Sequence, residues 1–179
     1  TAQAILRKDQ AESSKLKVLK FLDEVGFKNI PSQLQIEIGQ LNQALETEKK
    51  SYKAGQTLTT VHQRNHQQVG LTHQIKVLFG VPQIEFEAIL AHEFLHVWQN
   101  ENRLKLSPAE SEGLCELGAY LLYSQEESAF AQFKINKMKK NTDPLYGEGF
   151  RVQLAKLEKL GWENLIRELL GVKTQSPSQ

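Results

Sequence analysis

Hydrophobic and polar residues alternate with two different periods along the chain, and the change of period predicts where helices and strands lie. Near the N-terminus, hydrophobic residues at helical spacing predict a helix over 16–25, which Gly26 would end. A period of two then predicts half-buried strands, because successive side chains of a strand point to opposite faces. These strands are expected over 32–38, 57–62 and 69–79, with a short helix over 40–49 after the first.

The second half of the chain has mainly helical periodicity. A nearly continuous hydrophobic run indicates a buried helix over 88–98, and further helices are expected over 107–122, 124–140, 151–160 and 163–170. We therefore expect an α+β fold in which a small antiparallel sheet packs against a mainly helical domain. The polar ends of the chain predict a flexible or helical lead-in over 1–14, one domain over 15–171 and a disordered tail over 172–179.

Composition narrows the class of protein. The chain has 179 residues, enough for one domain with a sizeable core, and its formal net charge of +1 favours neither nucleic acid nor an anionic membrane. No stretch approaches the roughly 20 hydrophobic residues of a membrane span, and the single cysteine, Cys115, cannot form an internal disulfide. We expect a cytoplasmic protein, and because the chain begins with Thr1 we allow for a domain or targeting segment upstream.

Three polar residues interrupt the hydrophobic helix over 88–98, namely His92, Glu93 and His96. Burying such groups without partners costs roughly 2–7 kcal/mol for a neutral group, so the protein is expected to use them. His92 and His96 are four residues apart and project from one face, where two imidazoles can bind one Zn²⁺. Glu93 lies about 100° further round the helix, where it can take a proton from a zinc-bound water. The alternative is a core helix with two hydrogen-bonded histidines.

A catalytic zinc site needs a third protein ligand and an open position. The extended pattern with a third histidine is excluded, because Gln99 and Asn102 occupy its glycine and histidine positions. A carboxylate from the next helix is the other source, and Ser107 followed by a proline and a glutamate is a strong helix start. In that helix Glu112 and Glu116 are four residues apart and share a face.

We assign Glu112 as the third zinc ligand. Glu116, one turn further on, is expected to accept the outer N–H of His92 and so to fix the orientation of that ring. A solvated acidic face is the alternative, which we favour instead for Glu110 and Glu126. Small residues would let this helix approach the histidine helix closely, and they are Gly113, Gly118 and Ala119.

The order of a histidine helix and a glutamate helix resembles that of the gluzincin metallopeptidases. Within that group, the chain is similar to the peptidase domain of the plant LIM-domain peptidases that are activated by ubiquitin and limit organ growth, and to their bacterial relatives. The matching motifs lie in residues 78–82, 89–98, 106–115 and 143–151. The resemblance implies a zincin-like domain with a two-helix active site, one Zn²⁺ bound by His92, His96 and Glu112, and Glu93 as the catalytic acid and base.

The chain also departs from the plant proteins. A LIM domain needs clusters of cysteine and histidine, and this chain has one cysteine and five histidines. No ubiquitin-binding helix is evident either. Activation by ubiquitin is therefore not part of what the resemblance implies here.

Tyr146 and Arg151 are candidates for stabilising the oxyanion, which gluzincins commonly do with a Tyr, His or Arg after the glutamate helix. The alternatives are a packing role for Tyr146 and an ion pair with Glu148 for Arg151.

The predicted function is zinc-dependent hydrolysis of peptide bonds in protein or peptide substrates, with a zinc-bound water that Glu93 activates. The alternative is a non-catalytic, peptidase-like interaction module with a structural zinc. The lysines that end the helix over 124–140 are expected to form a solvated face, with a substrate patch as the alternative, and they are Lys134, Lys137, Lys139 and Lys140.

Overall fold

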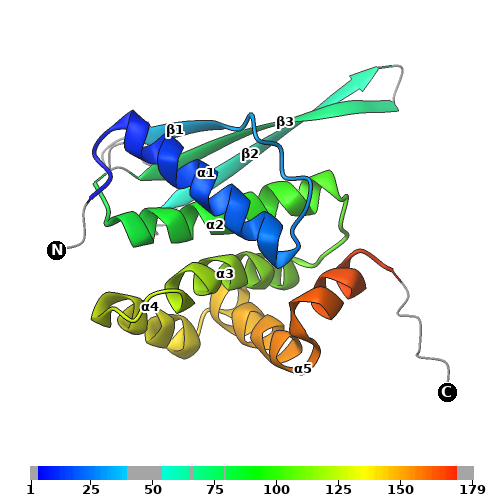
Figure 1. Cartoon of the computed structure of the whole chain (residues 1–179). Coiled ribbons are helices and arrows are strands. Elements are labelled where there is room, and N and C mark those ends of the chain that lie inside the picture. The colour runs from blue at the N-terminus through cyan, green and yellow to red at the C-terminus, as the bar shows by residue number, and fades with distance from the viewer. Residues whose placement is uncertain (1–3, 40–53, 65–66, 79, 173–179) are drawn as a thin grey trace.

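The computed structural model describes residues 4–39, 54–64, 67–78 and 80–172. The elements in chain order are α1 (Lys8–Val25), β1 (Gln35–Gly39), β2 (Gly55–Arg64), β3 (Gln67–Leu78), α2 (Gln83–Glu101), α3 (Pro108–Ser124), α4 (Ala129–Lys140), η1 (Pro144–Glu148) and α5 (Gly149–Leu169). In Figure 1 the sheet lies on one side of α2, while α3 lies on the other side, followed by α4 and α5. The predicted α+β class is confirmed.

The sheet has the strand order β1-β3-β2 and is mixed. β2 and β3 form an antiparallel hairpin, whereas β1 pairs in parallel with β3, from Gln35 opposite Gln74 to Gly39 opposite Leu78. The prediction of an antiparallel sheet is therefore wrong for β1. A period of two reveals which face of a strand is buried, but it carries no information on the direction of the neighbouring strand. The helix predicted over 40–49 lies outside the described residues.

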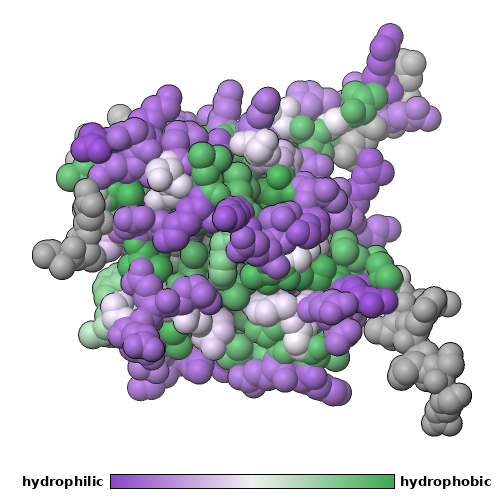
Figure 2. All heavy atoms as spheres, viewed as in Figure 1, coloured by the Kyte–Doolittle hydropathy of each residue, from purple (hydrophilic) through white to green (hydrophobic). Residues whose placement is uncertain are grey.

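Helix α1 begins at Lys8, before the hydrophobic periodicity begins. Its first half is polar, but tertiary partners bind those polar groups. Lys15 is 7% exposed and its Nζ donates to the carbonyl of Leu34 at 2.8 Å, while the Ser14 hydroxyl donates to buried Glu87 at 3.2 Å. Mostly hydrophilic side chains cover the outer face of α1 in Figure 2.

Helix α2 is the centre of the core, because the sheet, α1 and α3 all pack against it. Phe94 and Leu95 are fully buried, and the Trp98 ring meets Phe27 edge-to-face with 5.0 Å between centroids. Each such side chain contributes about 1.5–3 kcal/mol when it leaves water. Among the helices within the described ranges, none has both the length and the hydrophobic composition that crossing a membrane requires.

Glycines set the distances between the C-terminal helices. A Cβ on Gly118 would lie 2.9 Å from Leu95 Cδ1 and 3.0 Å from the Ala91 carbonyl oxygen, so α3 approaches α2 closely there, as predicted. Gly113 instead packs against the backbone of Gly149 in α5. The expectation that Gly113 faces the histidine helix is therefore wrong, because its position on α3 points away from α2.

Replacing Gly113 with alanine tests this close approach. Alanine normally stabilises a helix by about 1 kcal/mol relative to glycine, but here its Cβ would collide with rigid backbone. We expect Gly113→Ala to lower the free energy of unfolding by about 1–3 kcal/mol in urea denaturation. Gly70→Ala in β3 is the matched control, because a Cβ there meets nothing within 4 Å. Equal stability of the two variants would contradict the packing argument.

Candidate metal centre

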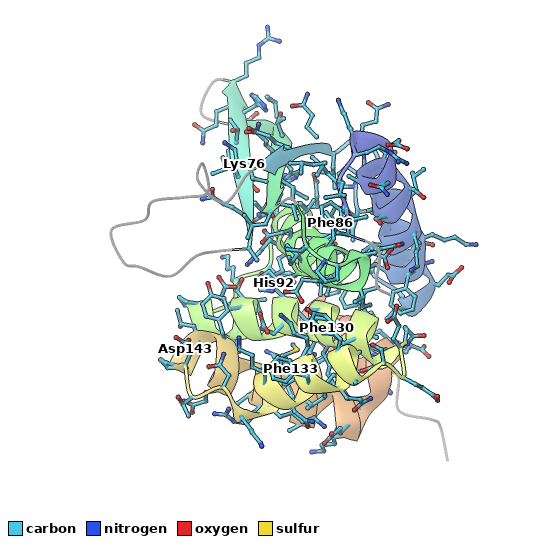
Figure 3. All side chains as sticks on the ribbon, turned by 90° about the vertical axis from the view of Figure 1, so that its left-hand side faces the viewer. Lys76, Phe86, His92, Phe130, Phe133 and Asp143 are labelled. Carbon is cyan, nitrogen blue, oxygen red and sulfur yellow. The ribbon has the colours of Figure 1, made fainter. Side chains whose placement is uncertain are left out.

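Helices α2 and α3 lie side by side and direct the predicted polar residues toward each other. In Figure 3, His92 lies between these two helices. The start of α3 is fixed by the predicted capping box, in which the Ser107 hydroxyl accepts from the Glu110 N–H and the Glu110 carboxylate accepts from the Ser107 N–H. The second turn of α3 therefore carries Glu112 opposite the histidine pair.

The Glu112 carboxylate lies between the two imidazoles. Its Oε2 atom is 3.3 Å from His92 Nε2 and 3.4 Å from His96 Nε2. Ligand atoms about 2.0–2.1 Å from a tetrahedral zinc lie roughly 3.3–3.4 Å from one another, so these spacings suit a shared ion. Oε2 is also buried and has no hydrogen-bond partner within the described part of the chain. A buried carboxylate oxygen without a donor is unfavourable unless a cation compensates it.

Glu116 lies on the other side of His92. Its Oε1 atom is 3.2 Å from His92 Nδ1, the nitrogen that faces away from His96 and Glu112. Burial disfavours a charged His92 ring, but the carboxylates of Glu112 and Glu116 outweigh that effect and raise the pKa of His92 to about 10. Burial likewise opposes a charged Glu112, yet the two imidazoles lower the pKa of its carboxyl group. The protonation of each of these groups therefore depends on the charges of the others.

Cys115 is a further potential ligand, which the sequence alone did not single out. His92, His96 and Cys115 have donor atoms within 4.8 Å of one another and could hold a metal ion. However, Gln99 Nε2 donates to the Cys115 sulfur at 3.1 Å, and burial is the main cause of the raised pKa of the thiol. We favour Glu112 over Cys115, because Glu112 Oε2 lies 3.3 and 3.4 Å from the two imidazoles and has no hydrogen-bond partner among the described residues, whereas the Cys115 sulfur already accepts from Gln99.

Glu93 points into the space between α2 and β2. Its side chain is almost completely buried, and the Thr57 hydroxyl donates to Glu93 Oε2 at 2.6 Å. Nothing in the sequence pattern pointed to Thr57, because contact between β2 and α2 depends on how the sheet packs.

A cavity of about 560 Å³ opens beside the cluster. Its walls come from β2, α2, α3, α4 and η1, and they include Thr57, Glu93, His92, His96, Glu112, Glu116, Lys134, Lys137 and Tyr146. The prediction of a solvated lysine face is therefore wrong for Lys134, which is half-buried, whereas Lys137 is exposed although it also lines the cavity. Lys134 Nζ donates to Glu85 at 2.6 Å, and the Tyr123 hydroxyl donates to the same carboxylate at 2.8 Å. Helical spacing alone could not reveal that this face of α4 turns inward.

Tyr146 and Arg151 are placed differently. The Tyr146 ring stacks on His92, with 6.5 Å between centroids and 24° between planes. Asp143 fixes the preceding turn, because its Oδ1 accepts the N–H groups of Leu145 and Tyr146 at 2.8 and 3.0 Å. Arg151 is exposed and donates to the carbonyl of Asn141, and it is not among the residues that line the cavity. The structure thus brings Tyr146 to the cluster and leaves Arg151 outside.

The site lies mainly within a stretch that is similar to known proteins. Residues 38–125 match the DA1-like family, described as Protein DA1. This match contains α2 and α3 with all five acidic and histidine residues of the cluster, whereas Tyr146 lies beyond it. The predicted resemblance to plant LIM-domain proteins is supported to this extent.

Individual relatives are plant proteins. The chain is 24% identical to Protein DA1 of Arabidopsis thaliana over 76% of its own length. It is 32% identical to Protein DA1-related 2 of the same plant over 48%, and 25% identical to the LIM domain-containing protein HDR3 of Oryza sativa subsp. japonica over 53%. The chain spans only 36%, 22% and 26% of these three proteins, respectively. No solved structure matches the chain.

Two single substitutions distinguish the possible ligand sets. Loss of a residue that only hydrogen-bonds a metal ligand typically weakens metal binding by roughly 10- to 100-fold. We expect Glu112→Ala, which removes a ligand, to weaken zinc binding by more than this. Cys115→Ala should bind zinc as tightly as the parent, because the sulfur already accepts a hydrogen bond from Gln99. Competition with a chelator, with zinc measured by mass spectrometry, gives both affinities. The reverse order of affinities would assign the third ligand to Cys115.

Proposed function

We propose that the protein is a zinc-dependent peptidase that hydrolyses peptide bonds in protein substrates. His92, His96 and Glu112 would bind one zinc ion, and Glu93 would be the general base. The observation that supports this most is the buried Glu112 Oε2, which lacks a hydrogen bond and lies 3.3 and 3.4 Å from the two imidazole Nε2 atoms. Two histidines and one glutamate leave an open coordination position, as catalytic zinc sites require.

The side chains around that position have complementary roles. A zinc ion there would polarise a substrate carbonyl and lower the pKa of a neighbouring water to about 7. Glu93 takes a proton from the attacking water and returns it to the leaving amine, so proton transfer is balanced over the reaction. Glu116 holds the His92 ring through Nδ1. Tyr146 stacks on that ring, and its hydroxyl donates to the developing oxyanion.

The edge of the sheet offers a way to bind a peptide. β2 is an outer strand, and its first residues line the cavity next to Glu93. An extended peptide can add to such an edge through main-chain hydrogen bonds, which give affinity with little dependence on side chains. We therefore place the substrate along β2, a choice that the sequence left open. Similarity to parts of the plant relatives is consistent with a shared chemistry, and any wider activity of those proteins is not implied.

Glu93→Gln tests the general base. Glutamine keeps the shape and can accept the Thr57 hydrogen bond, but it cannot take a proton. We expect zinc content equal to that of the parent and a loss of casein hydrolysis of about 10²-fold or more. Chelator-treated parent protein is the control for metal dependence. Zinc-loaded parent protein without hydrolysis would instead favour the non-catalytic interaction module.

Tyr146→Phe tests the oxyanion role. The phenyl ring can still stack on His92, so folding and zinc binding should be unchanged. Loss of the hydroxyl should lower kcat by about 10²- to 10³-fold with a small effect on KM, because the donor acts mainly in the transition state. Arg151→Gln is the comparison variant, and a larger loss in that variant would transfer the role from Tyr146 to Arg151.

A further inference from the structure

The first residues of β2 face α2 at the level of Glu93. Successive residues of a strand point to opposite faces, so Gly55, Thr57 and Thr59 point to the same side. Thr57 reaches Glu93, and the Thr59 hydroxyl accepts from Asn100 two turns further along α2, at 2.9 Å. Figure 1 shows β2 passing over α2 along this line.

Both oxygens of the Glu93 carboxylate are restrained by this strand. The Thr57 hydroxyl lies 2.6 Å from Oε2, a length typical of hydrogen bonds to an ionised carboxylate, and 3.2 Å from the Glu93 carbonyl oxygen. On the other side, a Cβ on Gly55 would lie 2.6 Å from Oε1 and 2.6 Å from Ile89 Cγ2. Oε1 therefore packs against a backbone position that has no room for a side chain.

We propose that Thr57 is a positioning residue for the general base, with Gly55 providing the space that the carboxylate occupies. This inference rests on the proposed role of Glu93. A general base must lie within about 2.6–3.2 Å of the proton it takes, and a misplacement of about 1 Å can cost 100-fold in rate. The Thr57 hydrogen bond fixes Oε2 and leaves Oε1 for the water. Among the described strands β2 is also an outer strand of the sheet, so the strand beside the proposed substrate site positions the base.

Three single substitutions of threonines on β2 test this role. Thr57→Val keeps the shape and removes the donor, Thr57→Ser keeps the donor, and Thr59→Val removes a hydroxyl between β2 and α2 that does not contact Glu93. We expect Thr57→Val to retain parental zinc content and KM and to lose about 10- to 100-fold in kcat. Thr57→Ser should recover most of kcat, and Thr59→Val should lose much less kcat than Thr57→Val.

Crystal structures give a readout that does not depend on activity. The Glu93 carboxylate should occupy one position in the parent and more than one in Thr57→Val. Gly55→Ala is a second route to the same displacement, and it should lower kcat without loss of zinc.

Parental kcat in Thr57→Val, equal losses in Thr57→Val and Thr59→Val, or an unmoved carboxylate would overturn the proposal. A zinc-loaded parent without Glu93-dependent hydrolysis would refute the peptidase function, while the position of the carboxylate would still decide whether Thr57 holds it.

Discussion

The structure depends on the close approach of two half-buried imidazoles and one half-buried carboxylate across the α2–α3 interface. Charged groups are costly inside a protein unless partners compensate them at short range. The two helices must therefore hold a fixed separation, which Gly118 permits because a larger residue would collide with Ala91 and Leu95. The geometry of the polar cluster is thus a consequence of hydrophobic packing at the same interface.

The charges around this cluster favour a cation. Glu93, Glu112 and Glu116 all line the same cavity as His92 and His96, so acidic groups outnumber the imidazoles beside them. Each carboxylate has a different environment: Glu93 accepts from a hydroxyl, Glu116 faces the outer nitrogen of His92, and Glu112 has a buried oxygen without a donor. In the proposed mechanism these environments would give one residue type three roles: a proton-transfer group, an orienting group and a ligand.

The cavity joins parts of the chain that are distant in sequence. β2 restrains Glu93 from one side, and the turn before α5 brings Tyr146 onto His92 from another. Gly147 and Gly149 allow this turn to pass close to Asn141 and α3. The DA1-like family match covers residues 38–125, which include the α2–α3 cluster but not this turn. The place of Tyr146 in the cavity wall comes from the structure of this chain.

Local sequence determined the elements and the pairing of His92 with His96, because helical spacing and capping depend on neighbouring residues alone. It also placed Glu112 and Glu116 on one face of the next helix. The packing of helices and strands decided the rest: the parallel direction of β1, the inward position of Lys134 in α4, the hydroxyl of Thr57 on Glu93 and the separation of Tyr146 from Arg151. These features are contacts between elements distant in the chain, and a one-dimensional pattern records which face of an element is buried but not what covers it.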